Sequence, residues 1–204
     1  MTAIYTKHYN KPPINYTEIA RYASIKKLSP STQEIINSCI DELQNKITYK
    51  VCYSEFPIKL ISDSEYTINM NFSTIKSADL YKNLLKCNNI IVFAATIGIE
   101  IDRLIAKYSS ISPSKALMLQ AIGTERLESL CDIFSKDISH SKLQSNQYPH
   151  PRFSPGYGDL PIELQRDIFQ TLDCYRKIGI SLNKSLIMSP SKSVTAIIGI
   201  ENKE

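Results

Sequence analysis

The segment Tyr148-Pro149-His150-Pro151-Arg152-Phe153-Ser154-Pro155-Gly156-Tyr157-Gly158-Asp159-Leu160-Pro161 is the most distinctive stretch of the 204-residue sequence. It holds four of the ten prolines and two of the six glycines. Each proline fixes its own φ and favours an extended conformation in the residue before it, whereas glycine readily adopts positive φ. We therefore expect a stiff, irregular loop in which several backbone N–H and C=O groups have no helix or strand partner.

Two interpretations of this loop are open. Arg152 offers a planar fork of N–H donors that suits a carboxylate or phosphate, and Tyr157 adds a flat aromatic ring. A stiff loop with these groups is a reasonable cradle for a small molecule. The alternative is a structural connector in which Arg152 pairs with a surface acid.

Composition narrows the class of protein. The 24 basic and 20 acidic residues are not gathered into runs, so nucleic acid is not indicated as a partner. The longest apolar stretch, 90–99, is far too short to span a membrane, and the N-terminus has no apolar signal core. Five scattered cysteines without a Cys-x-x-Cys pair favour buried thiols in a reducing cytosol, so we expect a cytoplasmic protein.

Apolar periodicity and capping residues predict a series of helices. Ser31 and Glu34 resemble a capping box for a helix that ends near residue 46. Ser77 is a candidate N-cap, and Ser112-Pro113 is expected to begin a long helix that ends near residue 139. A helix started by Pro161 and ended by Gly179 is expected to turn one set of polar residues outward: Glu163, Gln165, Arg166, Asp167 and Gln170.

Strands are predicted between these helices. The segment 47–61 contains two short strands or one strand interrupted at Pro57, and 66–72 contains another. Residues 90–96 read as a strand buried on both faces. In the tail, 185–189 and 193–200 form a hairpin or pair with different neighbours. The mixture has no regular βαβ order, so we predict one α+β domain over residues 1–204.

Several kinds of catalytic site are not indicated. The three histidines have no ligand-spaced partners, so no metal site is expected. The sequence has neither a Gly-x-Ser-x-Gly elbow nor a Walker loop, and the single glycine of 94–98 predicts a packing turn, which argues against a Rossmann-type methyltransferase. Glu125, Glu128 and Asp132 are spaced to share a solvated acidic face of the long helix, unless the 152–157 loop packs against it.

Residues 152–157 resemble the Arg-Pro-Ala-x-Gly-Tyr loop that binds S-adenosylmethionine in the activation domain of cobalamin-dependent methionine synthase. Downstream, Met188-Ser189-Pro190 and Ser193-Val194 resemble the Ala-Met-x-Pro and Ser-Val-Ser-Gly segments of that family. The whole chain is similar to the stand-alone version of this domain, specifically over 150–200 and less closely over 90–140.

The resemblance implies a helmet-like antiparallel sheet with flanking helices, and a role in reactivation. A cobalamin carried by a partner homocysteine methyltransferase is remethylated from S-adenosylmethionine, with an electron from a flavodoxin or ferredoxin. The chain then needs no general base or covalent group of its own, because its task is to position the methyl group. The first alternative is a non-catalytic regulatory module that binds a corrinoid protein, and the second is an ordinary methyltransferase.

The resemblance also assigns roles to single residues. Arg152 matches the arginine that holds the methionyl carboxylate, and Ser154 stands where the family has an alanine that offers backbone groups. Gly156 matches the glycine of close approach, Tyr157 matches the tyrosine beside the ligand, and Glu128 is assigned to the amino group. The family places a further ligand tyrosine beyond the Ser-Val strand that the sequence up to Glu204 does not include, and the family's N-terminal aspartate has no assigned match.

Overall fold

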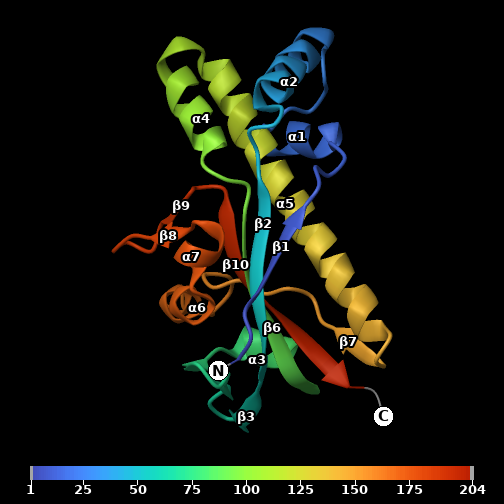
Figure 1. The fold of residues 1–204 in the computed structure, drawn as a ribbon, viewed down its shortest axis with the longest axis vertical. Helices are drawn as coiled ribbons and strands as arrows, with labels where there is room; N and C mark the ends of the chain where they lie inside the picture. The colour runs from blue at the N-terminus through green and yellow to red at the C-terminus, as the bar shows by residue number, and fades with distance from the viewer. Residues whose placement is uncertain (1, 203–204) are drawn as a thin grey trace.

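The structure is a computed structural model that describes residues 2–202, and its centre is an antiparallel sheet with the strand order β1-β2-β6-β10-β7. The strands are β1 Tyr5–Tyr9, β2 Tyr49–Pro57, β6 Cys87–Thr96, β10 Ser193–Asn202 and β7 Gln147–Pro149. Helices flank this sheet, with α5 crossing one side and α6 and α7 on the other (Figure 1). The predicted α+β class is confirmed.

Strand β6 lies in the middle of the sheet and is buried on both faces, as its apolar run predicts. Its side chains alternate between two cores. Ile91 and Phe93 enter the core beside α5, whereas Ile90 and Val92 enter the core beside α6 and α7. The sheet therefore separates two apolar layers.

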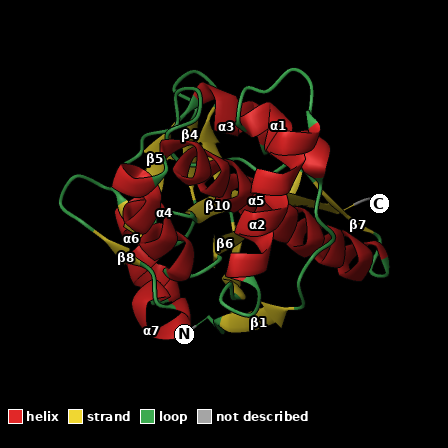
Figure 2. Cartoon of the chain, turned by 90° about the horizontal axis from the view of Figure 1, so that it is seen from above, coloured by secondary structure: helices red, strands yellow, loops and turns green. Residues whose placement is uncertain are grey.

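Helix α5, Pro113–Leu143, covers one face along most of its length. Helices α1 Tyr16–Tyr22, α2 Pro30–Leu43 and α4 Glu100–Ile111 gather around it, as Figure 2 shows from above. Gly123 permits close packing on this helix, because a Cβ there would lie 2.9 Å from the Cδ1 atom of Ile101 on α4. The predicted capping box of α2 is wrong in register: Ser29, not Ser31, is the N-cap and accepts a hydrogen bond from Thr32 N at 3.2 Å.

The single helix predicted after Pro161 is two helices, α6 Leu164–Leu172 and α7 Cys174–Ile178. Asp173 has a left-handed conformation with φ of 47° and separates them. Gly179 ends α7 in the left-handed region, as predicted. Pro161, however, lies three residues before α6 rather than in its first turn.

Two small sheets complete the fold. One contains β3 Lys59–Ser62, β4 Thr67–Asn69 and β5 Thr74–Lys76, and it precedes α3 Ala78–Asn83, which Ser77 caps as predicted. The other pairs β8 Ser181–Leu182 with β9 Met188–Ser189. The two tail strands therefore pair with different neighbours, because β9 joins β8 whereas β10 joins β6 and β7.

Two further expectations concern the chain as a whole. All five cysteines are buried free thiols, as predicted. Burial raises the pKa of Cys131 on α5 to about 12, so this thiol stays protonated at neutral pH. No helix within residues 2–202 has both the length and the apolar content needed to cross a membrane.

Candidate functional site

The Pro- and Gly-rich loop lies along the edge of β10 and is fastened at both ends. Phe153 and Ile197 exchange two backbone hydrogen bonds of 2.8 Å, which form an isolated antiparallel bridge. At the other end, Asp159 accepts hydrogen bonds from Ser77 Oγ and from Ala78 N at the start of α3. The loop is therefore held between the large sheet and the capped start of α3.

The middle of the loop folds on itself. Gly156 N donates to Leu160 O at 2.9 Å, and Tyr157 N donates to Ser154 O at 3.1 Å. Gly156 has φ of +88°, and a Cβ there would lie 3.3 Å from the Cδ1 atom of Ile162. This position therefore requires glycine for its backbone conformation, with the side chain of Ile162 close behind it.

The sheet edge stays open next to this loop. Because Phe153 pairs with Ile197, continuing the register would set Pro155 opposite Thr195. Proline has no N–H, so the ladder ends there. Backbone groups of residues two apart on a strand point the same way, so the N–H and C=O of Thr195 face the loop rather than β6.

A pocket of about 450 Å³ occupies this place between the loop, β10, α5 and α6. Arg152, Ser154, Tyr157 and Glu128 border it, and Gly156 shapes the loop without lining the pocket. The other lining residues are Phe93, Phe153, Pro155, Gln165, Met188, Val194 and Thr195. Four of the five residues singled out from the sequence are thus brought together at one pocket.

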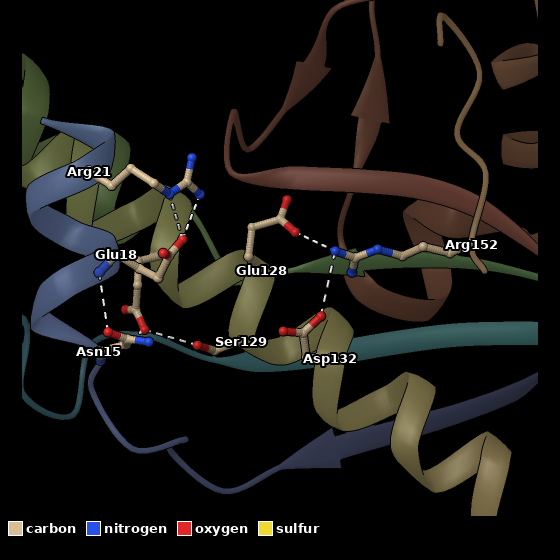
Figure 3. Close-up of polar contacts among 8 residues, drawn as sticks. Asn15, Glu18, Arg21, Glu128, Ser129, Asp132 and Arg152 are labelled. Carbon is tan, nitrogen blue, oxygen red and sulfur yellow. Dashed lines mark hydrogen bonds and ion pairs between the residues drawn. The ribbon is translucent and has the colours of Figure 1, made fainter. Parts of the chain in front are cut away.

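Arg152 points from the loop toward α5 (Figure 3). Its Nη2 atom donates to Glu128 Oε2 and lies 3.6 Å from Asp132 Oδ1. Burial by itself lowers the pKa of Arg152, but Cys131, Glu128 and Asp132 outweigh this and raise it, so the guanidinium keeps its charge. The loop thus packs against the acidic face of α5, and the pairing with acids is the feature that the connector interpretation expects.

The pairing leaves one side of the guanidinium unused. Arg152 Nη1 is buried and has no hydrogen-bond partner, and the same is true of Gln165 Oε1 and Thr195 Oγ1. All three residues line the pocket. An unsatisfied buried polar atom costs about 1–3 kcal/mol, so these three atoms are available to a polar ligand or to water in the pocket.

Gln165 corrects the sequence-based prediction. It was expected on the outward face of its helix, yet it is only 5% exposed. The expectation grouped it with its polar neighbours. The i, i+3, i+7 spacing of a buried stripe on this helix includes Gln165, Ile168 and Leu172. This spacing was the signal in the sequence from which the burial of Gln165 could have been predicted.

Glu125 corrects a second expectation, because it does not share the solvated acidic face. Glu125 and Arg126 are each 2% exposed and form an ion pair at 2.5 Å. Arg126 also donates to the carbonyls of Pro12 and Pro13 at 2.6 and 2.7 Å, while Glu125 accepts from Asn15 N at 3.1 Å. This pair fastens the N-terminal segment to α5 and takes no part in the pocket.

The structure gives no support for a metal centre at this pocket. Across residues 2–202, no group of three or more His, Cys, Asp or Glu side chains is arranged to hold a metal ion. The unpartnered polar atoms of the lining residues are a cationic donor, an amide oxygen and a hydroxyl, and the single carboxylate of the lining, Glu128, is paired with Arg152. Such a set suits an organic ligand with both charged and neutral polar groups.

Comparisons with known proteins agree with this architecture. A family model described as vitamin B12 dependent methionine synthase, activation domain, matches residues 78–203. A solved structure described as the MetH reactivation domain bound to AdoHcy has a TM-score of 0.73 with 16% sequence identity. The match covers all of this chain and 80% of that one, and at this identity it establishes the fold alone. No curated protein matches the sequence.

Proposed function

The chain belongs to the family of activation domains of vitamin B12-dependent methionine synthase, and on this premise we propose that the pocket beside Arg152 binds S-adenosylmethionine. The observation that carries the proposal is the meeting of three buried, unpartnered polar atoms at one pocket, one of them on Arg152. The resemblance of residues 152–157 to the family's loop assigns Arg152 to the arginine that holds the methionyl carboxylate, which supports the proposal. The AdoHcy bound to the structural neighbour is a compound of the same class.

In this proposal each residue has a binding role. Arg152 Nη1 donates to the carboxylate of the ligand, and Glu128 receives its ammonium group. Gly156 keeps the loop in its left-handed turn, and Ser154 contributes its N–H, because its C=O is already bonded to Tyr157 N. Tyr157 is 72% exposed, so its ring lies at the rim and covers the ligand from outside.

The proposed task is to present the methyl group to a cobalamin that a partner methyltransferase carries. One electron from a flavodoxin or ferredoxin would reduce that cobalamin to a cobalt nucleophile. The cobalt forms a bond to the methyl carbon while the S–CH₃ bond breaks. The electron pair of the broken bond stays on sulfur, and S-adenosylhomocysteine leaves. In this proposal the residues of the pocket need only bind and orient the sulfonium, and neither the Ser154 hydroxyl nor the Glu128 carboxylate takes part in the chemistry.

The second candidate is a regulatory module that binds a corrinoid protein without using the ligand. The ion pair between Arg152 and Glu128 favours it, because it already neutralises the charge that a carboxylate would use. Titration with S-adenosylmethionine separates the two candidates. Saturable binding supports the first, and no binding up to millimolar ligand, with or without the corrinoid partner, supports the second.

Activity is tested by supplying the chain in trans to a partner that carries cob(II)alamin, with a low-potential reductant. We expect faster formation of methylcobalamin, followed by the visible spectrum of the corrinoid. Gly156→Val abolishes this effect, because a β-branched residue is strained at positive φ and meets Ile162. Equal rates with and without the chain would contradict the proposal, whereas turnover on a small acceptor without a corrinoid would indicate an ordinary methyltransferase.

A further inference from the structure

Gln165 is the polar side chain that α6 contributes to the pocket. It is 5% exposed, and its Oε1 atom has no partner. Thr195 alternates with Val194 and Ala196 along β10 and shares the orientation of Ile197, which belongs to the core beside α6 and α7. Gln165 and Thr195 therefore line the α6 side of the pocket, whereas Glu128 lines the α5 side.

The two sides differ in charge. Arg152 and Glu128 carry opposite charges, which match the carboxylate and ammonium groups of an amino acid. Gln165 is neutral and lies in a pocket that Phe153 and Met188 make partly apolar. A buried neutral amide binds a neutral polar group best, because a charge placed there would lose its hydration without a counter-ion.

We propose that Gln165 is a specificity-determining residue that binds the adenine base of the ligand. This inference rests on the proposed function, because it concerns the other end of the same S-adenosyl compound. An amide presents one acceptor and one donor side by side, and glutamine pairs in this way with the amino group and the neighbouring ring nitrogen of adenine. The Oε1 atom accepts from the N6 amino group, and Nε2 donates to N7, so the contact is with the N6/N7 edge of the base.

This arrangement excludes hypoxanthine, the base in which a carbonyl replaces the amino group. On the same edge hypoxanthine presents O6 and N7, which are two acceptors in place of one donor and one acceptor. Rotating the amide by half a turn does not help, because Oε1 then faces N7, which carries no proton. One buried acceptor always opposes another, and such a mismatch weakens binding about 10- to 100-fold.

The experiment compares S-adenosylhomocysteine with S-inosylhomocysteine by isothermal titration. We expect the wild-type chain to bind the adenosyl compound about 10- to 100-fold more tightly. Gln165→Leu keeps the size and helix preference of the side chain but removes both polar atoms, so the preference falls to within about threefold. Gln170→Leu is the matched control, since Gln170 is exposed on the same helix and does not line the pocket, and the preference stays unchanged.

The outcomes are distinguishable from failure of the proposed function. If the wild-type chain binds neither compound, the S-adenosyl site itself is wrong. If it binds both compounds equally, or if Gln165→Leu keeps the full preference, the site stands and the role of Gln165 is wrong. Gln165→Met serves as a second variant if the leucine variant does not fold, and the wild-type ratio decides the question without any variant.

Discussion

Two arginines, Arg126 within α5 and Arg152 on the loop packed against it, differ in how many of their guanidinium nitrogens have hydrogen-bond partners. Arg126 is 2% exposed, and its Nε, Nη1 and Nη2 atoms all donate to Glu125 or to the carbonyls of Pro12 and Pro13. Arg152 pairs with Glu128 and Asp132 through Nη2 alone, and its Nη1 atom is buried without a partner. We therefore expect Arg126 to stabilise the fold, and we expect Arg152, which keeps a buried donor without a partner, to contribute mainly to the proposed binding.

The strongest test of this difference is removal of Arg126. Arg126→Leu leaves Glu125 charged and buried without its partner, which costs about 3–5 kcal/mol of unfolding free energy. For a chain of this length the thermal midpoint should fall by roughly 6–20 °C, as measured by circular dichroism. The double variant Glu125→Gln/Arg126→Leu should recover part of the loss, and a midpoint within about 2 °C of wild type would show that Arg126 is not structural.

Removal of Arg152 should have the complementary effect. Arg152→Ala weakens S-adenosylmethionine binding about 10- to 100-fold, because a hydrogen bond to a charged group is worth about 1.5–3 kcal/mol. Arg152→Lys recovers only part of the affinity, since a point charge does not reproduce the fork. Titration calorimetry measures the affinity and a thermal scan shows a small change in midpoint. An alanine variant with wild-type affinity would remove Arg152 from the site.

The smallest expected effect concerns the counter-ion of Arg152. Glu128→Gln should weaken binding about two- to fivefold, since exposed or half-exposed ion pairs are worth about 0.2–1 kcal/mol and Glu128 is assigned to the ligand ammonium. Asp132→Asn is the control, because Asp132 contacts Arg152 but does not line the pocket. Tighter binding by Glu128→Gln would show instead that Glu128 only competes with the ligand for Arg152.

The same comparison shows which features the sequence could predict. Local signals predicted the two-sided burial of β6, the start of α5 at Ser112-Pro113 and the stiffness of the loop, because apolar periodicity, proline and glycine act over a few residues. The position of Arg152 at a pocket came from its family motif. Local signals also indicated Gly179 as the end of a helix.

Other features depend on distant contacts. Glu125 looked like part of an acidic face, and its burial depends on Pro12 and Pro13 more than a hundred residues away, through the N–H groups of Arg126. The break between α6 and α7 depends on a left-handed conformation at Asp173, and residues other than glycine rarely adopt that conformation. The pairing of β7 with β10 also joins segments far apart in sequence. None of these has a signal within a short window of sequence.

The interrupted ladder beside Thr195 also bears on how this chain avoids aggregation. An open sheet edge is a template on which a strand of another molecule can pair. Here Pro155 would occupy the next paired position after Phe153, and a proline offers no N–H to an incoming or neighbouring strand. We therefore expect this loop, which borders the pocket, to hinder strand pairing by a second chain at this edge.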